Sequence, residues 1–292
     1  MRNARCNGQL SDGTRCGNVG TVKIALKNRG GRNAYFCAHC AQRLGSYFEE
    51  NNTRYGKVKM NAFTFSLELE THGYANGYDG ASLTGRMELA EKGFVPTSDS
   101  TVDIEFKSPI WEGLNAPSKF MVSLEALMAE GEVSIDSKCG SHFHVGHREY
   151  INAETIDYMR RFCHSLFVPL SDELLAHPAE TKRMFGRSFP TRWAQPITAD
   201  TYATKHENFI NLQHDWTVEF RLCKFVNAEQ YQNLMRFCKD VTNTLIKGFI
   251  MKFNEEPRDT RRYANKTEYR KHNAEKTAQK LVKLYRKYAG LE

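Results

Sequence analysis

Carboxylate and imidazole side chains recur two residues apart at several places in this chain. The residues concerned are Glu68, Glu70, Glu105, His142, His144, Glu219 and Arg221. Residues i and i+2 of a β-strand point to the same side, roughly 6–7 Å apart. Carboxylates gathered on one side of a sheet would repel one another, so divalent cations would have to offset that repulsion. Oxygen-rich sites with one or two imidazoles suit Mg²⁺ or Mn²⁺.

Each of these residues lies in a segment where apolar and polar residues alternate, as in a strand with one covered face. The apolar positions are Phe63, Phe65, Leu67 and Leu69, then Val102, Ile104 and Phe106, then Phe143 and Val145, and finally Trp216, Val218, Phe220 and Leu222. An antiparallel sheet often has one face in water, so a plain solvated face is the alternative for the acidic and histidine pairs. For Glu219 and Arg221 the alternative is a surface ion pair without function.

Segments with helical spacing lie between the expected strands. They are 117–129, a longer helix that runs from Asn152 through Leu170, a helix that begins at Asn227 and continues through Leu245, and a last amphipathic helix over 267–288. Asn227 and Gln230 have the form of a capping box. The pattern predicts an α+β fold in which a curved antiparallel sheet carries the site on its polar face and helices cover its apolar face.

Four of the eight cysteines lie near the beginning of the chain, among glycines that favour short turns and ribbons over helices. They are Cys6, Cys16, Cys37 and Cys40. Four thiolates at this spacing suit a closed tetrahedral Zn²⁺ site, which would stabilise a module too small to fold alone. Two disulfides, or His39 as a ligand in place of a cysteine, are the alternatives. The zinc is expected to be structural, and a second role in recruiting a partner stays open.

The charge is uneven along the chain. Residues 1–56 carry nine Lys/Arg and three Asp/Glu, residues 257–292 carry eleven and four, and the total is +7, so the middle is acidic. Basic ends leave nucleic-acid contact open as a lesser alternative. No apolar run is long enough to span a membrane, and the polar start lacks an apolar signal core. We therefore expect a reduced, cytoplasmic protein with three parts: a zinc-ribbon or treble-clef-like module (1–48), a main domain (58–256) and a basic amphipathic helix (257–292).

Four motifs in this order resemble the amidoligase family, which has many phage-encoded members and belongs to the glutamine synthetase and glutamate–cysteine ligase superfamily. The segments are Phe65-Ser66-Leu67-Glu68-Leu69-Glu70, then Asp99-Ser100 with Ile104-Glu105 and Ser108-Pro109, then Cys139-Gly140-Ser141-His142-Phe143-His144-Val145-Gly146, and finally Asn211-Leu212 with Thr217-Val218-Glu219-Phe220-Arg221. The resemblance spans about residues 60–250. It implies a glutamine-synthetase-like sheet and places the protein in a bacterial or phage-infected cytoplasm.

The resemblance also implies roles for particular residues. Five of them would ligate Mg²⁺ (or Mn²⁺): Glu68, Glu70, Glu105, His142 and Glu219. His144 and Arg221 would contact the phosphates of ATP or the transferring phosphoryl group. Arg187 or Arg192 would supply a further phosphate-binding arginine, and Arg221, His144 and Arg187 are the expected catalytic residues.

The implied reaction joins a carboxylate to an amine through an acyl phosphate and releases ADP. The substrates would be small molecules, peptides or proteins that carry these groups. Two other functions stay open: a zinc-containing nucleic-acid-binding or adaptor protein that uses its basic ends, and a binding protein with the ligase fold but without turnover.

Overall fold

The computed structural model describes residues 22–26, 32–36, 63–98, 101–198, 205, 207–252 and 265–292. Near the beginning of the chain, β1 (Val22–Leu26) and β2 (Arg32–Phe36) pair as antiparallel strands. The four cysteines of the expected zinc site, Cys6, Cys16, Cys37 and Cys40, lie outside the described residues, as do Asp99 and Ser100. The zinc site therefore stays a prediction.

The main sheet has seven strands in the order β10-β11-β9-β3-β7-β6, with β8 also paired to β3. Their bounds are β3 (Phe63–Thr71), β6 (Val95–Thr97), β7 (Ile104–Lys107), β8 (Trp111–Glu112), β9 (Ser141–His147), β10 (Ile210–Asn211) and β11 (Val218–Cys223). All of these strand pairs are antiparallel. β4 (Tyr74–Ala75) and β5 (Tyr78–Asp79) form a separate pair. The expected mixture of helices and an antiparallel sheet is confirmed.

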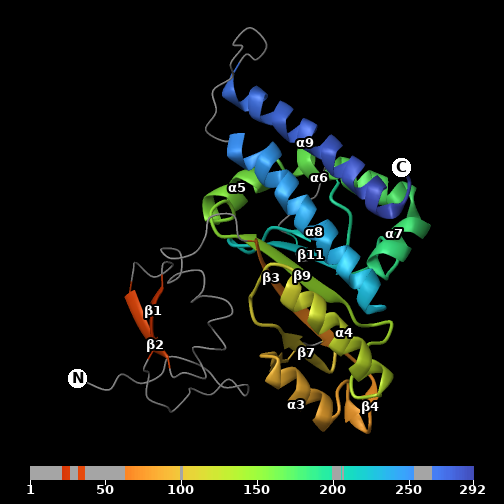
Figure 1. Cartoon of the computed structure of the whole chain (residues 1–292). Helices are drawn as coiled ribbons and strands as arrows, with labels where there is room; N and C mark the ends of the chain where they lie inside the picture. The colour runs from red at the N-terminus through yellow and green to blue at the C-terminus, as the bar shows by residue number, and fades with distance from the viewer. Residues whose placement is uncertain are drawn as a thin grey trace.

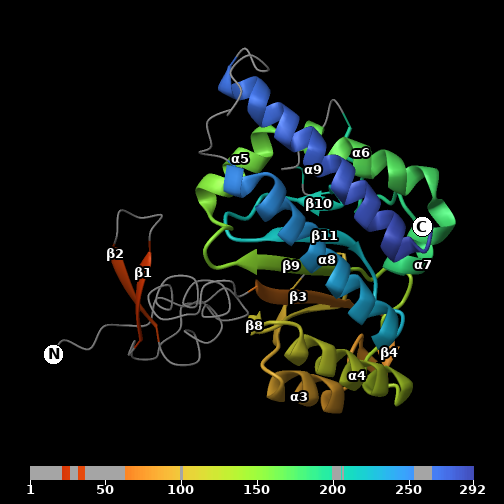
Figure 2. The same cartoon turned by 45° about the horizontal axis from the view of Figure 1, so that its top comes forward.

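Helices cover one face of this sheet. They are α3 (Leu83–Glu91), α4 (Asn115–Ala129), α5 (Ala153–Arg161), α6 (Cys163–Ala176), α7 (Pro178–Phe185), α8 (Ala228–Gly248), the short 3-10 helix η3 (Ile250–Lys252) and α9 (Lys266–Ala289). The long helix α8 packs on β9 and β11 with α4 beside it, and α9 packs on α6 and α8 farther from the sheet (Figures 1 and 2). Among the described helices, none has the length and apolar character that crossing a bilayer requires.

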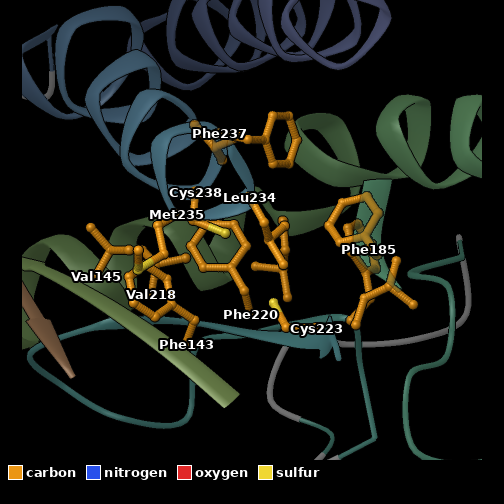
Figure 3. Close-up of a cluster of buried hydrophobic side chains, with 14 of the residues drawn as sticks. Phe143, Val145, Phe185, Val218, Phe220, Cys223, Leu234, Met235, Phe237 and Cys238 are labelled. Carbon is orange, nitrogen blue, oxygen red and sulfur yellow. The ribbon is translucent and has the colours of Figure 1, made fainter. Parts of the chain in front are cut away.

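The apolar side of the alternating strands meets α8 in the core. Figure 3 shows Phe143, Val145, Val218 and Phe220 of the sheet against Leu234, Met235 and Cys238 of the helix, and all of them are buried. Burial of apolar area on this scale is the main stabilising term for such a packed layer. The polar side of the same strands is left to face away from α8.

Two local expectations need correction. The single helix expected from Asn152 to Leu170 is two helices, because Phe162 (φ −116°) interrupts the helical backbone. Asn227 accepts from the backbone N–H of Gln230 as expected, but the Gln230 side chain donates to the carbonyl of Met184, so the cap is one-sided. In addition, the pairing of β11 with β9 shifts its register between Phe220 and Cys223, so that Cys223 lies opposite Ser141.

Candidate functional site

Strand register brings the acidic segments together. In β3, Glu68 lies opposite His142 of β9 and opposite Lys107 of β7, while Glu70 lies opposite Glu105 of β7. Directly opposite residues of antiparallel strands project to the same face. Residues far apart in the sequence therefore share one face of the sheet because three neighbouring strands align them.

His142 lies at the centre of this face. Its Nδ1 is 3.0 Å from Oε2 of Glu68 and 3.7 Å from Oε1 of Glu219, and its Nε2 is 3.4 Å from Oε1 of Glu70. One imidazole thus contacts three carboxylates, from β3 and β11. All four side chains are buried although they lie on the face away from α8.

Three buried polar atoms beside His142 have no hydrogen-bond partner among the described residues: Nε2 of His144, Oε2 of Glu219 and Nε of Arg221. The other atoms of these groups are bonded: Nη1 of Arg221 donates to Oε1 of Glu219 at 2.6 Å, and Nδ1 of His144 lies 3.3 Å from Oγ1 of Thr217. Leaving a buried polar group unpaired costs about 1–3 kcal/mol, and more when it is charged. A buried carboxylate oxygen without a hydrogen bond is suited to binding a cation.

Cationic side chains also belong to the cluster. Nζ of Lys107 lies 2.8 Å from Oε1 of Glu68 and 3.3 Å from Oε1 of Glu105. Arg187 and Glu70 both crowd Gly140: a Cβ at that glycine would lie 2.8 Å from Nη1 of Arg187 and 3.3 Å from Oε2 of Glu70. Protein cations therefore offset part of the carboxylate charge that the sequence assigned to metal ions alone.

The second arginine lies elsewhere. Arg192 is exposed, and its guanidinium stacks over the ring of Trp193 at 4.6 Å. No contact found within the described ranges joins Arg192 to the acidic cluster. Of the two arginines left open by the sequence, the structure thus brings Arg187 to the site.

Mutual attraction shifts the ionisation of these groups. Burial opposes the charge on Glu68, but the hydrogen bond to His142 and the attraction of His142 and His144, whose Nε2 lies 3.7 Å from Oε2 of Glu68, outweigh it and hold the pKa of Glu68 well below its ordinary value. Burial likewise opposes ionisation of Glu219, whose pKa His144, His142 and Arg221 nevertheless lower. The pKa of His144 is raised, because Glu68 and Glu219 outweigh its burial. Burial and the charge of Glu68 raise the pKa of Glu105.

Sequence reasoning missed two members of the site. Lys107 stands two residues after Glu105 on the same alternating segment, so its position was visible, but the sequence does not show whether a lysine there faces water or a carboxylate. His214 lies between β10 and β11 and gives no periodic signal; its Nε2 is 3.6 Å from Oε2 of Glu219 and its ring centroid is 5.5 Å from that of His144. Burial and the charge of His144 lower the pKa of His214, so it favours the neutral form that binds metals.

Three groups of side chains could each hold a metal ion. They are Glu70 with Glu105 and His142, Glu68 with His142 and Glu219, and His144 with His214 and Glu219. Within each group, one ligand atom per residue lies within 4.8 Å of the others. The first two groups use the five residues expected to bind Mg²⁺, and their carboxylate oxygens with one imidazole fit that ion or Mn²⁺.

Comparisons with known proteins add little to this geometry. No protein-family model matches the chain, and no curated protein matches it. Among solved structures, one described as "Crystal structure of novel glutamine synthase homolog" is 12% identical, with a TM-score of 0.34 over 88% of this chain and 72% of that chain. A likeness this low carries no argument about activity, which therefore rests on the side chains themselves.

Proposed function

We propose that this chain is an ATP- and Mg²⁺-dependent carboxylate–amine ligase of the amidoligase type. One observation carries the proposal: the face of the sheet opposite α8 gathers the carboxylates of Glu68, Glu70, Glu105 and Glu219 around His142, with Oε2 of Glu219 buried and without a hydrogen bond. A solvated sheet face would leave such groups exposed to water instead.

The residues divide the work between them. Glu68, Glu70, Glu105, His142 and Glu219 would hold the magnesium ions, which when bound supply charge neutralisation for the phosphates. Arg221 and Arg187 would bind phosphate oxygens, because a guanidinium matches their geometry. Nε of Arg221 is available for such a contact, since it is buried without a partner. Nε2 of His144, which also has no hydrogen bond and lies 3.7 Å from Oε2 of Glu68, would donate to the transferring phosphoryl group.

The reaction then follows in two steps. An oxygen of the substrate carboxylate attacks the γ-phosphorus of ATP, the bond to the β,γ-bridging oxygen breaks, and ADP leaves. The nitrogen of the amine attacks the acyl carbon of the resulting acyl phosphate, phosphate leaves, and the nitrogen loses a proton as the amide forms. The contribution of the protein to the first step is positioning and charge stabilisation.

Two other functions compete with this proposal. A binding protein without turnover would also gather these residues, since Lys107, Arg187 and Arg221 offset much of the carboxylate charge. A nucleic-acid-binding protein would rely on the basic C-terminal helix. In α9, however, Ala274, Ala278, Leu281 and Tyr285 are buried against the body, which gives this helix a packing role of its own.

Release of ADP tests the proposal against both. The full chain would be incubated with ATP, Mg²⁺ and a panel of carboxylates paired with amines, beside Glu70→Gln and a control, Glu229→Gln, at an exposed position of α8. We expect release that needs both Mg²⁺ and an amine, a loss of at least about a hundredfold in Glu70→Gln, and an unchanged control. Equal activity of wild type and Glu70→Gln, or no amine-dependent release with any pair, would reject the proposal.

A further inference from the structure

One group of metal-binding side chains differs in kind from the others. His144, His214 and Glu219 bring two imidazoles and one carboxylate together, with a ligand atom of each within 4.8 Å of the others. Two of the three residues are almost wholly buried, His144 at 2% and Glu219 at 1% exposure. Their atoms Nε2 and Oε2 have no hydrogen-bond partner among the described residues.

Neighbouring residues hold His144 and Glu219 through their other side-chain atoms, so Nε2 of His144 and Oε2 of Glu219 are left without a hydrogen bond. Nδ1 of His144 lies 3.3 Å from Oγ1 of Thr217, and a ligating histidine usually bonds through its other ring nitrogen in this way. Oε1 of Glu219 is held by Arg221 at 2.6 Å and lies 3.7 Å from Nδ1 of His142. The two oxygens of Glu219 therefore face different groups, Oε1 toward His142 and Oε2 toward His214.

His214 completes the group from the solvent side. Its Nε2 is 3.6 Å from Oε2 of Glu219, and its side chain is 40% exposed, whereas the other two ligands are buried. Metal–nitrogen distances of about 2.1 Å place ligand atoms roughly 3 Å apart. His214 and Glu219, at 3.6 Å, would therefore have to approach each other by roughly half an ångström around an ion, and the exposed imidazole is the one with room to move.

The donor types select the ion. Mg²⁺ prefers oxygen ligands in a near-ideal octahedron, whereas two imidazoles with a carboxylate suit Zn²⁺, Mn²⁺ or Fe²⁺. We propose that His144, His214 and Glu219 form a transition-metal site, separate from the two magnesium positions and joined to them through the carboxylate of Glu219. At this site Nε2 of His144 binds the metal in place of the transferring phosphoryl group, and the binding can be measured without the ligase reaction.

Manganese is the probe that tests this site. Mn²⁺ avoids the N-terminal cysteines, because soft thiolates select softer ions. The full chain would be titrated with Mn²⁺ in a large excess of Mg²⁺, and free Mn²⁺ followed by its paramagnetic resonance signal. Three proteins are compared: wild type, His214→Ala, and His272→Ala as a control on the distant helix α9.

We expect wild type and His272→Ala to retain a bound Mn²⁺ that Mg²⁺ does not displace, and His214→Ala to bind it at least about tenfold more weakly. Displacement by Mg²⁺ in wild type, or the same affinity in His214→Ala, would overturn the proposal. Circular dichroism checks that each variant is folded. If ADP release fails but His214→Ala weakens Mn²⁺ binding, the metal site stands and the ligase proposal falls. If ADP is released but Mn²⁺ binding is the same in both proteins, the ligase proposal stands and the metal site falls.

Discussion

Lys107 is the residue that most changes the physical picture of the site. Its ammonium lies between Glu68 and Glu105, two of the carboxylates that the sequence assigned to magnesium. Those two charges raise the pKa of Lys107 although burial opposes it, so the side chain stays cationic at neutral pH. The lysine therefore acts as a counter-ion for both carboxylates. A divalent ion that binds Glu68 or Glu105 must either share these carboxylates with Lys107 or displace it.

Without the Lys107 ammonium, the stability of the fold should depend more strongly on Mg²⁺. In Lys107→Met we expect the free energy of unfolding to fall by roughly 1–3 kcal/mol without divalent ions, because Glu68 and Glu105 lose a charged partner. Added Mg²⁺ should restore more stability to the variant than to wild type, since it substitutes for the lost charge. Thermal melts with and without Mg²⁺ measure both effects.

The matched control is Lys92→Met. Lys92 lies at the end of α3 and forms a largely exposed ion pair with Glu88, one helical turn earlier. Such pairs contribute little, so its melting temperature should hardly change under either condition. Equal responses of Lys107→Met and Lys92→Met to Mg²⁺ would show that Lys107 does not compete with cations.

The pair of Glu68 and His144 predicts a pH dependence. The pKa of Glu68 lies below its ordinary 4.5, so its contribution is present above that pH and is lost as pH falls through the folded value. The pKa of His144 lies above its ordinary 6.5, so its contribution is complete below that pH and is lost as pH rises through the folded value. Together they stabilise the fold most between about pH 4.5 and 6.5.

In magnesium-free buffer, we therefore expect His144→Gln to lose more stability relative to wild type at about pH 6 than at about pH 8.5. Denaturant unfolding at both pH values measures the difference. A loss of the same size at both would mean that His144 does not carry a charge in the folded protein.

At the scale of the element, β9 is the strand that the site depends on most. It lies between β3 and β11. One glycine, Gly140, directly precedes the strand, and another, Gly146, lies near its end. A Cβ at Gly146 would lie 2.5 Å from Oγ1 of Thr64 and 3.0 Å from the backbone oxygen of Trp216. The close approach of the Thr64 side chain and of the Trp216 backbone explains the glycine there.

The two glycines should respond differently to alanine. Gly146→Ala should lower the free energy of unfolding by roughly 1–3 kcal/mol, because the short Thr64 side chain and the backbone oxygen of Trp216 leave no room for a methyl group. Gly140→Ala meets the ends of two long side chains, Arg187 and Glu70, which can shift, so it should cost less stability but impair ADP release. Melts and the ADP assay on both variants compare these effects; a reversed order would contradict the placement of Arg187.

The elements were predictable where a pattern is local. Alternation predicted the faces of β3 and β9, because one side packs under α8. The break at Phe162 was not predictable, since apolar residues at helical spacing continue from Met159 to Leu166 across it. A strand as short as the two-residue β10 depends on pairing with its neighbour and is too short to show a period of its own.

The site was predictable where its residues belong to strands. Register turned separate pairs such as Glu68 with Glu70 and His142 with His144 into one cluster, as the resemblance implied. His214 was out of reach because a single histidine in a connection has no period, and the separation of Arg187 from Arg192 depends on tertiary packing. The choice of metal for each group likewise depends on distances that spacing does not give.

At the scale of the whole molecule, the N-terminal cysteines make a prediction independent of the sheet. We propose that Cys6, Cys16, Cys37 and Cys40 hold a structural zinc ion. The purified chain should then contain about one zinc, which Cys37→Ser removes while the buried Cys163→Ser leaves it in place. Metal analysis by mass spectrometry measures the content. Two disulfides in place of zinc would give a zinc-free wild type.

The central claim is that one sheet face binds divalent ions and the phosphates of ATP together. Anomalous diffraction from crystals grown with Mn²⁺ and a non-hydrolysable ATP analogue tests it most directly. We expect manganese peaks between Glu68, His142 and Glu219 and beside Glu70, with the γ-phosphate of the analogue against Arg221. Nucleotide bound away from this face, or no manganese among these carboxylates, would contradict the account.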